Sequence, residues 1–249
     1  VQFLTDNGAK EIVLLGQNVN AYNISHHGRK INIADLIEEI SKIKNIERIR
    51  YTTSHPINMS DELIKLHSTN DKLMPFLHLP VQSGSSNILR KMNRKYDINS
   101  YKKIIEKLKA VNPKIEISSD FIIGYPGETD DDFKKTLDLV SEVKFTQSYS
   151  FIYSARPGTK SALEQDITPL NIKKERLSIL QDKLRNIQFQ FNKSFCGKNI
   201  DVLVENQSIS NPEYFFGRTP FMQSVYIKSK KINPGEVKNV NISTCNHKN

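Results

Sequence analysis

Apolar and polar positions follow two different rhythms in the first two-thirds of the chain. Short runs rich in β-branched and aromatic residues predict strands at 11–15, 46–53, 76–81, 115–123 and 147–153. Between them, apolar residues recur at helical spacing and predict helices at 33–43, at 101–111, at 130–143 and after the capping residue Ser60. Strand–helix alternation of this kind predicts a parallel sheet with right-handed crossovers.

The pattern changes in the last third. Residues 172–195 read as a long basic helix, and short β-rich runs follow at 200–204, 224–227 and 237–242, separated by turn-prone Asn, Pro and Gly. We therefore expect an α/β fold: a partial parallel (β/α) barrel of the TIM type over 1–170, a connecting basic helix over 171–195 and a small antiparallel β-barrel over 196–249. No apolar run approaches the roughly 20 residues that a membrane helix needs, so no membrane is expected.

A cluster of polar and glycine residues follows each predicted strand. The clusters occupy 16–18, 53–56, 82–85, 118–120 with 124–128, and 154–159. Because ligand sites of parallel α/β folds lie at the carboxyl ends of strands, these clusters are expected to converge on one concave face. Any single cluster is better explained by turns and helix caps, which favour the same residue types. All of them together favour a site for a polar ligand.

Three of these residues admit two interpretations. His55, which precedes Pro56, either contacts a ligand or holds the turn after its strand. Asp120 lies inside an apolar strand, where a carboxylate is costly unless paired, so it is a site residue or the partner of a buried cation such as Arg50. Arg156 lies beside a Pro-Gly turn, where it either reaches an anion or is solvated.

Other patterns indicate little chemistry. Residues 124–127 (Gly-Tyr-Pro-Gly) lack the Gly-Lys-Ser/Thr ending of a P-loop. His26 and His27 have no carboxylate or Cys companions at ligand spacing, which favours loop surface over a metal site. Cys196 and Cys245 are the only cysteines, so no disulfide framework is expected and a cytoplasmic location is the default.

Positive charge is concentrated near the C-terminus. The formal net charge is +9, and residues 171–249 hold 13 Lys and Arg against 6 Asp and Glu. Residues 1–170 are nearly balanced, with 23 against 21. This asymmetry favours a polyanionic partner such as nucleic acid, and a well-solvated basic surface is the alternative.

Several motifs occur together in a characteristic order. They are GQNVNAY (16–22), RYTTSHP (50–56), HLPVQSGS (78–85), LRKMNRKY (89–96), SSDFIIGYPGET (118–129) and YSARPGT (153–159). This set resembles the methylthiotransferases of the radical-SAM superfamily, and the Ser54-His55-Pro56 form resembles the tRNA-directed branch. IDVLVE (200–205), FGRTPF (216–221) and PGEVKNVNIS (234–243) resemble a TRAM domain, a small RNA-binding β-barrel. The resemblance covers essentially the whole chain.

The resemblance implies a chemistry. In the family, a [4Fe–4S] cluster held by a CxxxCxxC loop cleaves S-adenosylmethionine to a radical that removes hydrogen from C2 of an adenine. A second cluster supports sulfur insertion, and a second S-adenosylmethionine supplies the methyl group. The expected product is 2-methylthio-N6-isopentenyladenosine, next to the anticodon.

Resemblance and strand position together assign residues to these tasks. Cofactor binding is expected at Gln17, Asn18, Ser54, His55, Gln82, Ser83, Asp120, Gly124 and Arg156, with 122–124 packing on the adenine. RNA binding is expected at Arg218, Lys228, Lys230 and Lys231, while Tyr214, Phe215, Phe216 and Phe221 either stack on bases or fill the small barrel. The implied partners are the anticodon stem-loop of tRNA and a reductant such as flavodoxin or ferredoxin, and a monomer is expected.

The sequence departs from the family at one decisive place, because it contains no CxxxCxxC. We therefore expect a fragment that begins just after the cluster loop and holds neither cluster, with no catalytic cysteine and no metal ligand. Three hypotheses stay open: part of a tRNA methylthiotransferase, a methylthiotransferase for threonylcarbamoyladenosine tRNA or a ribosomal protein, and a non-catalytic RNA-binding remnant.

Overall fold

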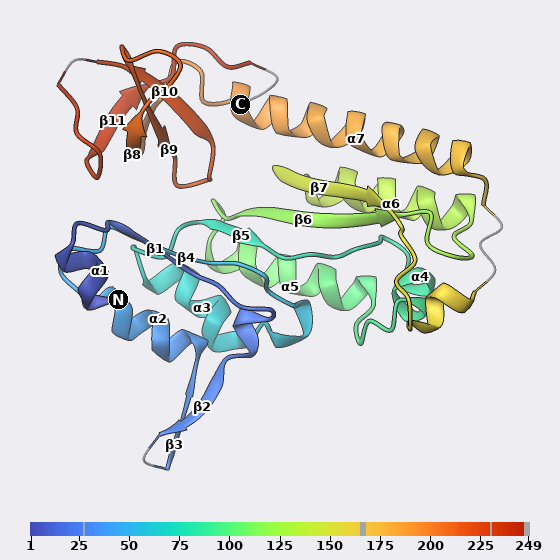
Figure 1. Ribbon diagram of the computed structural model, residues 1–249. Helices are drawn as coiled ribbons and strands as arrows, with labels where there is room; N and C mark the ends of the chain where they lie inside the picture. The colour runs from blue at the N-terminus through green and yellow to red at the C-terminus, as the bar shows by residue number, and fades with distance from the viewer. Residues whose placement is uncertain (27, 165–167, 230, 247–249) are drawn as a thin grey trace.

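A curved array of parallel strands forms the larger part of the computed structural model (Figure 1), which describes residues 1–26, 28–164, 168–229 and 231–246. The strands are β1 (Glu11–Leu14), β4 (Arg48–Tyr51), β5 (Phe76–His78), β6 (Glu116–Ile123) and β7 (Gln147–Ile152). β1 pairs with β4, and β5, β6 and β7 form a second sheet, all in parallel. A bridge between Ile49 and Leu73 joins the two sheets, so the strands form one open arc in the order β1-β4-β5-β6-β7.

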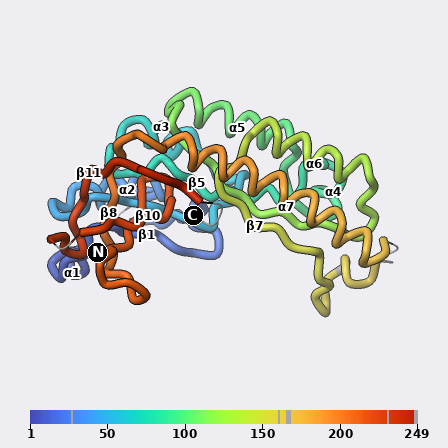
Figure 2. The backbone as a smooth tube through the Cα atoms, turned by 90° about the horizontal axis from the view of Figure 1, so that it is seen from above, coloured from blue at the N-terminus to red at the C-terminus, as the bar shows by residue number. Residues whose placement is uncertain are grey.

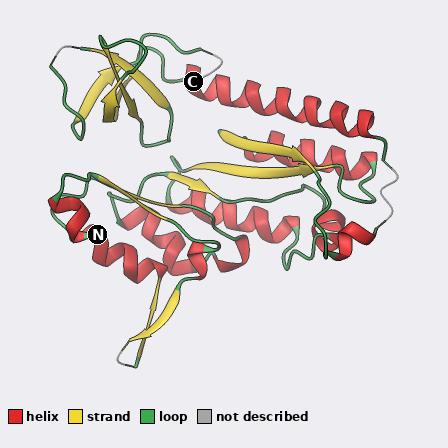
Figure 3. Ribbon diagram, viewed as in Figure 1, coloured by secondary structure: helices red, strands yellow, loops and turns green. Residues whose placement is uncertain are grey.

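Helices cover the convex side of this arc, as Figure 3 shows by its colouring. They are α2 (Ile33–Ser41), α3 (Asp61–Thr69), α5 (Ile98–Val111), α6 (Asp130–Val143) and α7 (Leu170–Lys193). Side chains of Ser60, Asp97 and Thr129 accept backbone N–H groups at three helix starts, which explains why the helices begin there. None of the helices within the described ranges is long and apolar enough to cross a membrane.

The alternation of side chains along β6 separates the core from the concave face. Ile117, Phe121 and Ile123 are buried beneath the helices, and the ring of Phe121 meets that of Phe145 edge-on at 5.3 Å. Asp120 and Ile122 fall between them and point to the other side, where the arc is open. The parallel α/β architecture expected from the sequence is therefore confirmed.

Several expected boundaries were wrong. The helix expected at 101 begins at Ile98 because Asp97 caps it, and the strand expected over 76–81 ends at His78. The sequence pattern also missed short or exposed elements: α1 (Gln2–Asp6), the hairpin β2 (Asn23–His26) and β3 (Arg29–Asn32), α4 (Ser86–Lys91), and the 3₁₀ turns η1 (Val19–Ala21), η2 (Pro56–Asn58) and η3 (Lys160–Leu163). His26 belongs to the exposed hairpin rather than to a loop, and His27 lies outside the described residues.

A separate antiparallel sheet follows α7. Its strands are β8 (Asn199–Gln207), β9 (Tyr214–Arg218), β10 (Ser224–Lys228) and β11 (Val237–Asn241), in the order β10-β9-β8-β11. A register shift between Val204 and Asn206 bends β8, so the sheet curls into a half-barrel. In both Figure 1 and Figure 2 this sheet lies beside β1 and β4, while α7 runs back along β7.

Two buried arginines of β4 connect the half-barrel to the parallel sheet. Arg48 donates to the carbonyl oxygens of Asp201 (3.0 Å) and Arg218 (2.7 Å). Arg50 donates to the carbonyl oxygens of Thr219 and Pro220 at 3.1 and 2.8 Å. These bonds fix the C-terminal sheet against the concave side of the N-terminal half of the arc.

The carboxylate that neutralises Arg50 is Glu11, not Asp120. Glu11 on β1 lies 3.1 Å from Nε of Arg50, and the two side chains are 17% and 5% exposed. The alternative expectation that Asp120 pairs with Arg50 was therefore wrong, because β5 separates β4 from β6 in the sheet order.

Replacing Arg50 by Met should weaken the joint between the two sheets. Removal of one partner of a buried pair leaves Glu11 without its cation, and we expect a loss of about 3–5 kcal/mol in the free energy of unfolding, measured with urea. The matched control is Arg185→Met, which removes an exposed pair with Asp182 and should cost less than about 1 kcal/mol. An equal loss of unfolding free energy in both variants would contradict a role for Arg50 in joining the two sheets.

Candidate functional site

The ends of β1 and β4 are hydrogen-bonded to each other. The backbone N–H of Val19 donates to the carbonyl of Thr53 at 3.3 Å. The Asn20 side chain exchanges two hydrogen bonds with the backbone of His55, at 2.9 and 2.8 Å. The first two polar clusters therefore form one continuous edge.

The remaining strand ends extend this edge. Gln82 N–H donates to the carbonyl of Asp120, and Ile122 N–H donates to the carbonyl of Gln82, both at 2.9 Å. Tyr153 N–H donates to the carbonyl of Ile123 at 2.8 Å. The five strand ends thus lie along a single rim, as the strand–helix alternation predicts.

Tyr96 joins the two halves of the rim. Its ring meets that of His55 edge-on at 5.4 Å, and its hydroxyl donates to the carbonyl of Val81 at 3.1 Å. Burial raises the pKa of Tyr96 to about 12, so the hydroxyl stays a donor. Burial, followed by the nearby charge of Arg94, lowers the pKa of His55 below its ordinary value and favours the neutral ring.

Several predicted site residues have structural partners. His55 Nδ1 accepts the N–H of Ile57 at 3.3 Å, which supports the turn-holding interpretation. Asn18 donates to the side chain of Asn58 at 2.9 Å. Gln17 is exposed at the β1 end of the rim. Ser54 is buried, and its hydroxyl has no hydrogen-bond partner among the residues that the structure describes.

The segment after β5 has an unusual backbone. Gln82 has a φ of 72°, a left-handed conformation that is uncommon outside glycine. Ser83 is buried and accepts the N–H of Ser85 at 3.2 Å. A Cβ on Gly84 would lie 2.4 Å from the Cα of Thr136, so only glycine allows α6 to approach this segment. The close packing fixes the position of Gln82 on the rim.

Asp120 belongs to a polar group on the concave face. Its Oδ2 lies 3.5 Å from Nε2 of His78, and Nδ1 of His78 lies 2.7 Å from the Ser118 hydroxyl. Sequence analysis did not single out His78. The signal that would have found it is register, because His78 on β5 stands opposite Ser118 on β6.

A charged contact from α7 holds the loop after β6. Glu128 accepts the N–H of Gly124 at 2.9 Å and lies 3.0 Å from Nη1 of Arg176. Burial raises the pKa of Glu128, against the opposing effects of Gly124 and Arg176. Arg176 also reaches Asp130 at 2.7 Å. Glu128 lies in the polar cluster predicted after this strand. Arg176 was expected among the basic residues that suit RNA phosphates, and that expectation was wrong because Arg176 is buried against Glu128.

A cleft of about 430 Å³ opens at the β6 and β7 end of the rim. The side chains that line it include those of Ile122, Tyr153 and Arg156, and Arg94 comes from the segment after α4. The cleft thus combines apolar surface with two cations, which suits a flat, partly anionic ligand such as a nucleotide. Of the nine predicted cofactor-binding residues, Arg156 lines this cleft and the other eight do not; Gln17 and Asn18 lie at the opposite end of the strand order.

The residues present do not fit an iron–sulfur cluster. Cys196 follows α7 and Cys245 follows β11, and both belong to the C-terminal part. Over the described stretches of the chain, no three His, Cys, Asp or Glu side chains gather as metal ligands. A cluster of this type needs several thiolates, so its ligands are not supplied by these residues.

The predicted RNA-binding residues are partly engaged. Arg218 lies 3.0 Å from Glu205 and over the ring of Phe216, and Lys228 lies 3.1 Å from Glu213. Lys231 is exposed, whereas Lys230 lies outside the described residues. The exposed pair of Lys228 is weak and leaves that cation usable for another anion. Arg218, by contrast, is half-buried between Glu205 and the Phe216 ring.

The aromatic residues of the half-barrel differ in how deeply they are buried. Phe215 is buried, and Phe221 packs against Phe191 and Phe195 at the end of α7, with ring centroids 5.8 and 5.6 Å away. Phe215 therefore belongs to the core, whereas Phe221 is half-buried and packs over the end of α7. Tyr214 and Phe216 are half-buried.

Comparison with known proteins identifies the class. Residues 1–140, more than half of the chain, match the radical SAM superfamily, and the chain belongs to that superfamily. It is 53% identical over 231 residues to a tRNA-2-methylthio-N(6)-dimethylallyladenosine synthase of Rickettsia canadensis, covering 91% of this chain and 51% of the relative. The Rickettsia conorii protein of the same name is 52% identical over 242 residues, with coverages of 96% and 54%. The chain thus spans about half the length of the curated relatives it matches.

Among solved structures, the chain is similar to coproporphyrinogen III oxidase from Escherichia coli, described as a radical SAM enzyme. The TM-score is 0.49 and the identity 18%, over 64% of this chain and 38% of that one. This similarity is too low to carry an argument about individual residues.

Replacing Arg176 by Met should loosen the loop after β6. Glu128 would lose the cation that faces it inside a buried site, so we expect the Gly124 amide to exchange hydrogen about tenfold to a hundredfold faster. Hydrogen-exchange mass spectrometry of a peptide spanning 124–128 measures this. Lys174→Met, on the exposed side of the same helix turn, should leave the exchange rate unchanged.

Proposed function

We propose that this chain is part of a tRNA methylthiotransferase that converts N6-isopentenyladenosine next to the anticodon to its 2-methylthio derivative. The observation that carries the proposal is the identity of 52–54% to relatives with that printed activity, over more than nine-tenths of the chain. The rim and its cleft are where such a reaction needs its ligands. The parts are a partial radical-SAM barrel over 1–170, a connecting helix over 171–195 and a TRAM domain over 196–249.

The rim residues would hold S-adenosylmethionine, which supplies the radical and the methyl group when it is bound beside an iron–sulfur cluster. Gln82, Ser83 and Asp120 lie near the centre of the strand order, where they would orient its ribose and amino acid part. Ile122 would pack on the adenine, whereas Ile123, expected there as well, is buried beneath the helices. Gly124 is buried beside the Lys173 side chain and would act by shaping the loop. The buried hydroxyl of Ser54, which lacks a partner within the described part of the chain, supports a polar ligand here. His55 and Asn18 would act by keeping the rim in shape.

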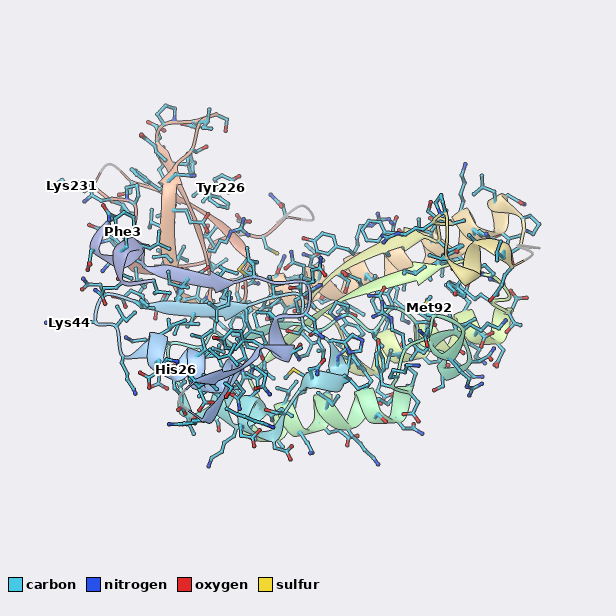
Figure 4. The ribbon with its side chains drawn as sticks, turned by 60° about the horizontal axis from the view of Figure 1, so that its bottom comes forward. Phe3, His26, Lys44, Met92, Tyr226 and Lys231 are labelled. Atoms are coloured by element: carbon cyan, nitrogen blue, oxygen red, sulfur yellow. The ribbon has the colours of Figure 1, made fainter. Side chains whose placement is uncertain are left out.

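The substrate would be held at two distant places. Figure 4 shows Met92, which lines the cleft, at the opposite end of the molecule from Tyr226 and Lys231 of the half-barrel. A folded RNA is large enough to reach both, and the excess of cations in residues 171–249 suits its phosphates. A reductant such as flavodoxin or ferredoxin, a monomeric state and a cytoplasmic location stay predictions.

The absence of cluster ligands supports one other function. A chain with this surface and no CxxxCxxC would still bind RNA, so a non-catalytic RNA-binding protein is the second candidate. A threonylcarbamoyladenosine or ribosomal-protein target is less well supported, since the relatives reported above carry the dimethylallyladenosine name.

A chimera tests the proposed activity. Joining the N-terminal half of the Rickettsia conorii relative to this chain should restore 2-methylthio nucleosides in a bacterium lacking its own enzyme, as measured by nucleoside mass spectrometry. Asp120→Ala or Gln82→Ala in the chimera should lower the product by about tenfold or more, since each removes polar contacts to the cofactor. Lys65→Ala, on the exposed side of α3, serves as the control. Full activity of both rim variants would contradict the site assignment.

Binding of RNA is tested on the chain itself. The double variant Lys228→Glu and Lys231→Glu should bind an anticodon stem-loop more weakly, and the slope of log Kd against log salt should fall by roughly 2 because two phosphate contacts are lost. The control, Lys65→Glu with Lys103→Glu, changes the net charge equally on the helical side of the barrel. If both double variants weaken binding alike, only net charge matters and the surface assignment fails.

A further inference from the structure

The last strand of the parallel array exposes two large aromatic side chains. Tyr149 is 54% exposed and Phe151 is 57% exposed, although both belong to β7. They are two positions apart, and Tyr153 follows at the same interval just beyond the strand. Side chains at this interval point to the same side of a strand, so the three rings form a ladder. We call Tyr149, Phe151 and Tyr153 the aromatic ladder.

Register places the aromatic ladder on the concave face. Tyr149 stands opposite Asp120, and Phe151 stands opposite Ile122. Paired residues of parallel strands project to the same side, and Asp120 faces His78 across the concave surface. The intervening Ser148 and Ser150 face the other side, where α7 packs along β7.

The rings of Tyr149 and Phe151 are open to a ligand. Neither takes part in any ring–ring or cation–ring contact within the described residues, although eight ring pairs and two cation contacts occur elsewhere in them. At the end of the ladder, the Tyr153 hydroxyl is buried and has no hydrogen-bond partner in that same part of the chain. Because buried hydroxyls are normally hydrogen-bonded, this one can donate to or accept from a bound ligand.

The charges beside the ladder indicate which ligand fits. Phe151 and Tyr153 line the cleft of about 430 Å³ together with Arg94 and Arg156. Flat aromatic surface and two cations in one cleft together match a nucleobase with an adjoining phosphate.

We propose that Tyr149 and Phe151 form a stacking surface for the RNA substrate, on which an unstacked purine lies flat. This inference rests on the proposed function and deepens it. Neighbouring ladder positions are about 6.6 Å apart along the strand, so a purine with its substituent spans both rings. Base–aromatic stacking tolerates different bases, so the ladder supplies affinity for a base of either purine type. Arg94 and Arg156, which line the same cleft, hold the adjoining phosphates.

A stacking-sensitive probe tests the proposal on the full chain. The fluorescence of 2-aminopurine riboside falls when it stacks on an aromatic ring, and the chain contains no Trp to interfere. We expect quenching by the wild-type chain, and an approximately tenfold weaker affinity for the double variant Tyr149→Leu with Phe151→Leu. Phe3→Leu is the matched control, because Phe3 is an exposed aromatic residue at the opposite end of the molecule from Met92 (Figure 4).

A second probe separates this inference from the proposed function. An RNA hairpin carrying 2-aminopurine in its loop reports RNA binding by anisotropy and base stacking by quenching. If the hairpin binds but its quenching is the same in the double variant, the ladder does not hold the base, while RNA binding stands. If the hairpin does not bind, the proposed function fails, and the riboside titration still decides whether the ladder stacks a purine.

The cofactor is the competing occupant. S-adenosylhomocysteine added to the riboside complex should leave the quenching in place if the ladder is reserved for the RNA base. Recovery of fluorescence in step with S-adenosylhomocysteine binding would assign the ladder to the adenine of the cofactor and overturn the proposal.

Discussion

The alternation of side chains along β6 is the constraint from which the rest of the molecule follows. One side of the strand packs Phe121 and Ile123 under the helices, and the packing of that side leaves no freedom of register, since a slip by one residue would bury Asp120 and expose Phe121. The opposite side is then committed to the concave face. The polar group formed by His78, Ser118 and Asp120 therefore lies on the concave face, where a ligand can reach it.

The guanidinium groups of Arg50 and Arg176 connect segments that are distant in the sequence. Arg50 uses a buried carboxylate from β1 and carbonyl oxygens from the C-terminal sheet. Arg176 reaches from α7 to the loop after β6. Both are costly to bury, and both are repaid only by several hydrogen bonds made at once. Because α7 begins at one of these contacts and ends at the other sheet, it acts as a stiff connection between the cleft and the half-barrel.

The described residues form a ligand-binding surface but not a set of ligands for an iron–sulfur cluster. The chain contributes the concave face, the cleft and a basic half-barrel, whereas the thiolates that an iron–sulfur cluster requires are not among its described residues. Because the polar rim is assembled from strand ends, it can form without the thiolates that hold a metal cluster.

The sequence by itself determined the strands of the arc, the longer helices and the family motifs, because all of these depend on residues that are close in the chain. Apolar periodicity located the strands of the arc and the longer helices, and the polar clusters marked the rim. Short exposed elements such as α1 and the β2–β3 hairpin escaped, since they bury too little to impose a pattern. Only the tertiary structure decided which charges pair. Glu11 rather than Asp120 neutralises Arg50. The pairs His78–Asp120 and Arg176–Glu128 could not be predicted from neighbouring residues in the sequence. The physical reason is that burial and strand register are set by the whole fold, and the cost of an unpaired charge depends on both.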